Sequence, residues 1–390
     1  MSERASARPA AGPDNQASHE TQWALIRRRF VRHKLAVAGL LILAVLYTLA
    51  IFAEFFAPYT SQWRDLGHAY CPPQPPRWSS KHGLHVYAVH RTIDPITFKR
   101  VYQEDPNDII PLGFGVRGQA TKLWGLIPMQ NRFFGVDIDA YRPPAIDGDD
   151  VTTRPAGLAT FYLLGADKYG QDIFSRIIYG SRISLSIGIV AIMVTFILGL
   201  TIGGISGYVG GAVDTFIQRL IEILNSFPAL PLWLALGAIM PSDWPPLWVY
   251  FGITIVLSLL GWTGLARVVR GKLLSLREED YAVAAKLIGA SHGRIIFRHL
   301  LPGFTSHIIV SLTLSVPGMI LGETSLSFLG LGLRPPVVSW GVMLQDCMNM
   351  QVLANYPWLL LPVIFIVMAV LSCNFVGDGL RDAADPYSAR

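Results

Sequence analysis

The sequence predicts an all-α membrane protein with six transmembrane helices and one large insertion outside the membrane. Hydrophobic residues make up 52% of the 390 residues and charged residues 15%, and the mean hydropathy is +0.40. This composition is more apolar than that of ordinary soluble domains. Six segments match the roughly 20 apolar residues that cross a bilayer. They cover residues 35–56, 183–205, 215–240, 248–265, 305–327 and 358–376.

The N-terminal region divides into a tail and an anchor. Residues 1–22 are too polar to pack a core, so we expect a disordered cytoplasmic tail. Residues 23–58 combine a basic, amphipathic helix at the inner interface with the first span. The apolar run is too long for a signal peptide, and the basic residues before it place the N-terminus in the cytoplasm. These residues are Arg27, Arg28, Arg29, Arg32 and Lys34.

The loop that follows the fourth span carries the same charge signal. Residues 267–303 include Arg267, Arg270, Lys272, Arg277, Lys286, Arg294 and Arg298, whereas residues 241–247 contain no Lys or Arg. By the positive-inside rule, this loop and both termini, including residues 385–390, are cytoplasmic. We therefore read the net charge of +5 as an orientation signal and expect no nucleic-acid partner.

Residues 59–162, between the first two spans, form an extracytoplasmic insertion that is too long for a simple connector. Residues 84–89 are typical of a strand, and Asp94-Pro95, Asp105-Pro106 and Pro143-Pro144 of turns. The insertion is either a surface for an external partner or a cap that stabilises the membrane domain. Its histidines (His82, His85, His90) lack further ligands, so we expect no metal site. Cys71 and Cys347 fall on the same side, and whether they bond stays open.

Residues 267–303, called the elbow below, have the pattern of two short helices joined by a sharp bend. Tyr281, Ala284, Ala285 and Ile288 are spaced to share one helix face, where the alanines let a partner approach closely. Gly289 is suited to end that helix in the left-handed conformation, and Ser291 to cap the next. This pattern indicates a docking lever.

The chain lacks the sequence signatures of energy-yielding or hydrolytic chemistry. Its only Gly-Lys pair, Gly271-Lys272, is followed by Leu273 where a P-loop needs Ser or Thr. No H-E-x-x-H helix occurs, and the G-x-S-x-G match at Gly289-Ala290-Ser291-His292-Gly293 lies between two helical patterns and not at the strand-to-helix turn of a nucleophile elbow. We expect a protein that is not an enzyme and binds no cofactor, so another polypeptide must supply the energy for any active process.

The elbow resembles the cytoplasmic EAA loop of bacterial ABC importer permeases. The match consists of Val283-Ala284-Ala285, Gly289 and His299-Leu300-Leu301-Pro302 at the family's spacing. Val283 stands where the family has glutamate, and His299 where it has isoleucine, which removes one charge contact but keeps the geometry. Residues 164–182, 323–341 and 374–386 are similar to signatures of the dipeptide, oligopeptide and nickel branch, in its second-permease type.

The resemblance implies the type I importer permease fold, with a core over residues 163–384, in a bacterial inner membrane. It implies half of a translocation pathway for peptides or similar small solutes; nickel, opine-like or sugar-conjugate substrates are the alternative. The implied partners are a related second permease, two ATP-binding subunits or one fused pair that use ATP and Mg²⁺, and a periplasmic binding protein. The insertion and residues 328–340 are the expected surface for the binding protein. The coupling residues implied are Tyr281, Val283, Ala284, Ala285, Gly289, Ala290, Arg294 and Pro302.

Polar and helix-breaking residues within the spans are the candidates for the pathway or its gate. They are Arg219, Glu222, Asn225, Pro228 and Glu323. Arg219 and Glu222 are spaced for a structural ion pair, which we favour over substrate contact. Glu323 either lines an outer gate or is exposed at the membrane edge. Pro228 and Pro231 either turn carbonyls toward the path or merely kink the third span.

Several glycines lie in or just after the second span, and the sequence also bears on two other protein classes. Gly199, Gly203, Gly204 and Gly207 would allow close packing along the path or at the interface with the second permease, unless they reflect the general glycine content of membrane helices. An ion-coupled transporter would need paired acidic residues in several spans, and a membrane hydrolase a nucleophile with its base. The sequence shows neither set.

Overall fold

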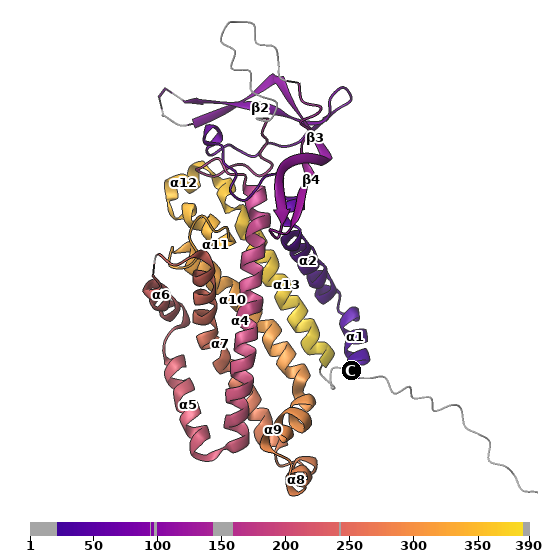
Figure 1. Cartoon of the computed structure of the whole chain (residues 1–390), viewed down its shortest axis with the longest axis vertical. Coiled ribbons are helices and arrows are strands. Elements are labelled where there is room, and N and C mark those ends of the chain that lie inside the picture. The colour runs from indigo at the N-terminus through magenta and orange to yellow at the C-terminus, as the bar shows by residue number, and fades with distance from the viewer. Residues whose placement is uncertain (1–21, 94, 97–99, 143–158, 242, 385–390) are drawn as a thin grey trace, which may run out of the picture.

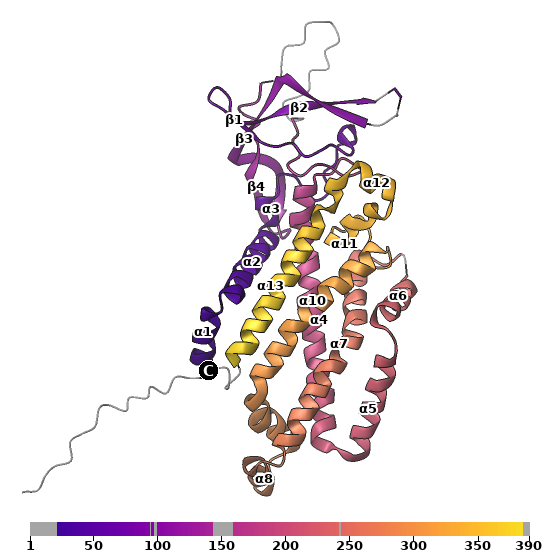
Figure 2. The ribbon, with the colours of Figure 1, turned by 180° about the vertical axis from the view of Figure 1, so that it is seen from behind.

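A computed structural model describes residues 22–93, 95–96, 100–142, 159–241 and 243–384. It shows a bundle of long helices with a β-sheet over one end and the short helix α8 at the other (Figures 1 and 2). The predicted tail, apart from Gln22, and the C-terminal residues 385–390 lie outside the described residues.

Five helices in the described part are long and apolar enough to cross a membrane. They are α2 (Lys34–Ile51), α4 (Ile173–Val209), α7 (Pro246–Leu276), α10 (Thr305–Phe328) and the run Pro357–Ala384, formed by η6 (Pro357–Leu360) and α13 (Leu361–Ala384). A sixth span exists only if α5 (Gly211–Ser226) and α6 (Ala229–Ile239) are counted together. Because the insertion contains a β-sheet, the chain is mostly helical and not entirely so.

The predicted third span, residues 215–240, is broken and not merely kinked. The axes of α5 and α6 differ by 86°. Phe227 has extended backbone angles (φ −86°, ψ 135°), as the residue before a proline prefers, and Pro228 caps the N-terminus of α6. Because proline has no backbone N–H, the hydrogen-bond ladder of α5 cannot pass through it.

Helix α4 begins ten residues before the predicted second span. Asp172 caps its N-terminus, because its Oδ2 accepts a hydrogen bond of 2.7 Å from the backbone N–H of Ser175. Burial raises the pKa of the Asp172 carboxyl to about 6. The apolar pattern alone missed this first part of the helix, because Arg176 and Arg182 interrupt it.

The glycines of α4 pack against α7 of the same chain. A Cβ at Gly203 would lie 2.5 Å from the Ala266 carbonyl oxygen, and one at Gly207 would lie 2.8 Å from that of Arg270. Gly199 likewise approaches the Leu265 side chain, whereas Gly204 has more room. At Gly203 and Gly207 the close packing that we predicted is confirmed, but it joins two backbones of this chain and not the chain to a second permease.

The insertion folds into an antiparallel sheet with strand order β1-β2-β3-β4. The strands are β1 (Arg77–Ser79), β2 (Gly83–Ile93), β3 (Arg100–Leu123) and β4 (Ile127–Val136). The predicted strand 84–89 is confirmed within β2. The turn predicted at Asp105-Pro106 is wrong, because both residues lie in β3 where a register shift opposite Tyr87 and Ala88 absorbs the proline. Asp94 and Pro143-Pro144 lie outside the described residues.

Short helices connect these elements. They are α1 (Gln22–Arg32), α3 (Ala53–Phe56), η1 (Leu66–His68), α8 (Asp280–Leu287), α9 (His292–Arg294), the π-helical η3 (Ile295–Leu300), η4 (Leu301–Phe304), α11 (Trp340–Met343), η5 (Leu344–Met348) and α12 (Met350–Asn355). The three cysteines are free and buried, so Cys71 and Cys347 are not bonded. No cluster of three metal-ligating side chains occurs among the described residues.

Candidate functional site

The elbow has the predicted helix-turn-helix geometry. Helix α8 ends at Leu287, and Gly289, the residue after its C-cap, has φ +87° and donates its N–H to the carbonyl of Lys286 at 3.0 Å. The N–H of Ala290 donates to the carbonyl of Ala285 at 3.1 Å, which completes a Schellman motif. The Ser291 side chain then caps α9 by accepting from the N–H of Arg294. The predictions that Gly289 ends one helix and that Ser291 caps the next are confirmed.

One side of the elbow packs on the helical bundle. Ala282 of α8 is 3% exposed, and the half-buried Ala285 and Ala290 join it. They contact a cluster that includes Leu273 from α7 and Ile295 from η3. The predicted shared face is therefore only partly correct, because Ala285 faces the chain's own core with Ala282.

The opposite side of α8 is apolar and uncovered. Tyr281 is 45% exposed, Val283 43%, Leu287 83% and Ile288 87%, and Ala284 is exposed beside them. Exposed apolar surface of this kind is typical of protein contacts. We call these five residues the α8 face.

A polar network that sequence patterns did not reveal joins the elbow to the turn between α4 and α5. Arg270 of α7 forms a bidentate pair with Asp214 of α5, with Nε–Oδ1 at 2.5 Å and Nη2–Oδ2 at 2.6 Å. Nδ1 of His292 lies 3.0 Å from the Tyr208 hydroxyl, and Arg277 donates to the Tyr208 carbonyl. The sequence gives one signal of this network, because Asp214 is an isolated acidic residue soon after a long uncharged segment. A displacement of the elbow would therefore reach α4, α5 and α7 together.

The remaining predicted coupling residues lie within the same structure. Arg294 is exposed in α9, and Pro302 lies in η4, where the helical run passes into α10. Residues from α8 to α10 thus form one bent helical connection at the end of the bundle opposite the sheet (Figure 1).

Three of the third-span candidates lie on the exposed helix α5, and Pro228 follows it. Arg219 Nη1 and Glu222 Oε2 are 2.6 Å apart, which confirms the predicted ion pair, and their side chains are 73% and 61% exposed. Oδ1 of Asn225 accepts a hydrogen bond from the Thr263 hydroxyl of α7 at 3.1 Å. Pro228 is exposed at the break before α6.

Glu323 does not fit either of its two predicted settings. It is 0% exposed, so it neither lines an open gate nor faces the membrane edge. Its carboxylate accepts hydrogen bonds from the hydroxyls of Ser184 (3.2 Å), Ser327 (2.9 Å) and Ser339 (2.8 Å). These serines come from α4, α10 and the segment before α11, so Glu323 joins three parts of the bundle. Nothing in the sequence around these three serines predicts that they contact Glu323.

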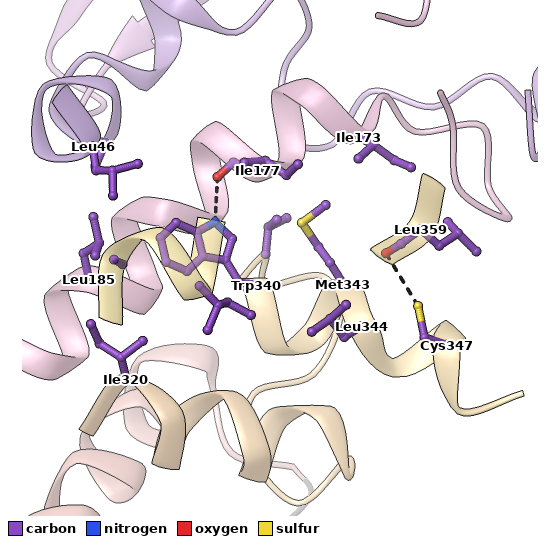
Figure 3. Packing of buried hydrophobic residues seen from close by; sticks show 14 residues of the cluster. Leu46, Ile173, Ile177, Leu185, Ile320, Trp340, Met343, Leu344, Cys347 and Leu359 are labelled. Atoms are coloured by element: carbon purple, nitrogen blue, oxygen red, sulfur yellow. Dashed lines mark hydrogen bonds between the residues drawn. The ribbon is translucent and has the colours of Figure 1, made fainter. Parts of the chain in front are cut away.

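The predicted binding-protein surface at residues 328–340 is only partly exposed. Trp340 is 0% exposed and packs among Leu46, Leu185 and Ile320, while its indole N–H donates to the Ile177 carbonyl at 3.1 Å (Figure 3). The exposed residues are Leu329 and 334–336. The last part of this segment is therefore core, because Val338 and Trp340 fill the corner between α10 and α4.

Two protein-family models match the chain. Residues 199–388 match the binding-protein-dependent transport system inner membrane component family. Residues 21–76 match the N-terminal TM domain of oligopeptide transport permease C. One solved structure, an inward-facing form of the MetNI methionine ABC transporter, has a TM-score of 0.42 at 16% identity, over 54% of this chain and 97% of that one.

Curated relatives agree with the family models. The dipeptide transport system permease protein DppC of Bacillus subtilis is 42% identical over 64% of this chain and 76% of the relative. The oligopeptide transport system permease protein OppC of the same species is 40% identical over 57% and 70%. The glutathione transport system permease protein GsiD of Pectobacterium atrosepticum is 39% identical over 59% and 74%. The chain therefore belongs to the inner-membrane permeases of binding-protein-dependent ABC transporters, in the oligopeptide and dipeptide branch of the permease C type.

Proposed function

We propose that this permease forms half of a pathway that imports peptides, and that ATP-binding partner subunits drive it by docking on the α8 face. The observation that carries the proposal is the uncovered apolar α8 face, because the segments before and after α8 are bonded to α5 through Arg270 and to α4 through His292. The peptide substrate is supported by relatives named for dipeptide, oligopeptide and glutathione transport. In this proposal ATP and Mg²⁺ are bound by the partners and not by this chain.

The proposed orientation places the elbow and both termini in the cytoplasm. The basic helix α1, the end of α13 and the elbow lie at the same end of the bundle, opposite the sheet (Figures 1 and 2). Arg277, Lys286, Arg294 and Arg298 add to the positive charge of that end. The sheet then faces the periplasm, where a binding protein would deliver the substrate.

The second permease would pack on α5 and α6. Phe216 is 70% exposed, Ile223 59% and Phe227 55%, and the exposed Arg219–Glu222 pair lies on the same helix as Phe216 and Ile223. An ion pair that faced lipid would be costly, so this surface suits a protein interface or a water-filled path. We assign Asn225 and Pro228 to the same surface, as pathway candidates.

A substitution at Gly289 tests the coupling role. Its φ of +87° strains any residue with a Cβ, by roughly 1–2 kcal/mol, and a β-branched residue more, although nothing lies within 4 Å of that Cβ. We expect Gly289→Val to lower peptide transport at least tenfold in proteoliposomes that contain the complete transporter, while ATP hydrolysis continues.

The matched control is Gly289→Asn. Asparagine adds more atoms than valine but tolerates the left-handed conformation, so the bend and transport should persist. Unchanged transport in Gly289→Val, with normal insertion of the chain, would show that the bend does not transmit the work of the ATPases.

A further inference from the structure

The β3–β4 hairpin of the insertion is attached to the ends of the membrane-spanning helices. The indole N–H of Trp124, in the hairpin turn, donates to the Ile51 carbonyl of α2 at 3.0 Å. The Arg182 guanidinium of α4 lies 4.3 Å from the centre of the Trp124 ring. Buried Arg132 of β4 donates to the carbonyl of Glu54. Figures 1 and 2 both show β4 beside α3 and the end of α2.

The positions of the charged residues indicate how deep in the membrane the hairpin is attached. Residues 35–53 of the first span and 183–209 of α4 contain no charged residue. Glu54 and Arg182 follow directly at the sheet side, with Oε2 and Nη2 2.7 Å apart. A helix over residues 35–53 is roughly 28 Å long at 1.5 Å per residue, close to the thickness of a hydrocarbon core. The ion pair therefore marks the hydrocarbon boundary, and Trp124 lies at that boundary.

The hairpin exposes large apolar side chains at this level. Leu126 is 82% exposed, Phe114 69%, Ile127 60%, Trp124 56% and Phe133 44%. We call these five residues the hairpin patch. Aromatic residues at the level of the lipid headgroups are typical of membrane-interface anchors, and an exposed Lys122 next to the turn suits lipid phosphates.

An open groove of about 390 Å³ continues the hairpin patch toward the helices. Two leucines and five phenylalanines line it, among them Leu49 of α2, Phe56 of α3 and Phe133 of β4. Leu49 belongs to the uncharged segment, so the groove opens at hydrocarbon depth. Its walls offer no polar partner in the part that the structure describes, which suits an acyl chain.

We propose that the β3–β4 hairpin anchors the insertion in the leaflet on the sheet side, with phospholipid acyl chains against the hairpin patch and in the groove. Lipid is favoured over protein as the occupant, because the exposed apolar surface continues from the hairpin along α2. There Leu41 is 63% exposed and Val45 58%. The anchor would hold the sheet at a fixed height over the bundle. This assignment does not depend on which solute is carried or on which side is cytoplasmic.

The test measures the depth of a spin label at Leu126. The full chain with Leu126→Cys, labelled with a nitroxide, is reconstituted with its partner subunits into vesicles of phosphatidylethanolamine and phosphatidylglycerol. Collision with oxygen reports lipid, and collision with a water-soluble nickel chelate reports water. The native cysteines are buried, and the unsubstituted chain gives their background. The control is Ile96→Cys, which is 86% exposed in the β2–β3 turn.

We expect oxygen collisions to exceed nickel collisions at least threefold at residue 126, and the reverse at residue 96. A label at residue 126 that is open to the nickel chelate would overturn the proposal. Protection from both reagents would assign the hairpin patch to another protein subunit, which also overturns it. If Leu126→Cys does not assemble, Ile127→Cys provides the same measurement with the same expected result.

Discussion

The corner between α10 and α11 at the sheet end and the elbow at the opposite end both reverse the chain between helices, but their side chains are buried very differently. At the corner, Glu323, Ser339 and Trp340 are each 0% exposed, and every one forms a hydrogen bond within the chain. At the elbow, Leu287 and Ile288 are 83% and 87% exposed. The corner is completed by its own chain, whereas the elbow leaves a surface for another subunit.

This difference predicts that substitutions at the corner act on stability. Trp340→Ala would leave a large cavity in the cluster of Figure 3 and cost about 3–5 kcal/mol of folding free energy, so the unfolding midpoint in detergent should fall by several degrees. The control is Trp248→Ala, because Trp248 is 62% exposed on α7. Equal effects of the two substitutions would contradict the assignment of the corner as core.

The α4–α7 contact lies between the two regions and should show an intermediate effect. Gly203→Ala would press a methyl group against the Ala266 carbonyl and cost about 1–3 kcal/mol. Gly264→Ala on α7 meets nothing within 4 Å and should be neutral or slightly stabilising, because alanine favours a helix. Thermal unfolding in detergent compares them, and a stable Gly203→Ala would show that the helices can separate without cost.

The smallest effect on stability is expected at the elbow. The double substitution Leu287→Asp and Ile288→Asp should change the free energy of unfolding by less than about 0.5 kcal/mol, as for other surface sites. It should still weaken binding of the ATP-binding subunits at least tenfold, which equals about 1.4 kcal/mol. Unfolding in detergent measures the change in stability, and titration of those subunits into membranes that contain the permease measures the change in affinity. Unchanged affinity would remove the α8 face from the interface.

The sequence alone allowed the membrane class, five of the six segments and the bend at Gly289 to be predicted, because each depends on local pattern. Apolar length defines spans, and glycine is the residue that a left-handed helix end requires. The sites that were wrong or missed depend on residues far apart in the chain. Glu323 meets Ser184, and Asp214 meets Arg270, only after the helices pack. The break at Pro228 was visible, but its 86° angle was not.

The two ends also differ in how far a family pattern could describe them. Val283 and His299 depart from the EAA pattern, yet the spacing of Ala284, Ala285 and Gly289 preserved the bend. At the sheet end, the same kind of resemblance placed Trp340 in a docking surface, whereas the residue is core. A sequence signature fixes where a segment belongs in the chain, and packing decides which of its side chains remain exposed.

Site-specific photo-cross-linking from Ile288 tests whether an ATP-binding subunit docks on the α8 face. A photoreactive amino acid replaces Ile288 in the purified, complete transporter, and the control replaces Trp78, which is 78% exposed on the sheet. We expect a covalent adduct between residue 288 and an ATP-binding subunit, with a yield that changes when nucleotide is added, and no such adduct from residue 78. An assembled, active transporter that gives no adduct from residue 288 with an ATP-binding subunit would contradict docking on the α8 face.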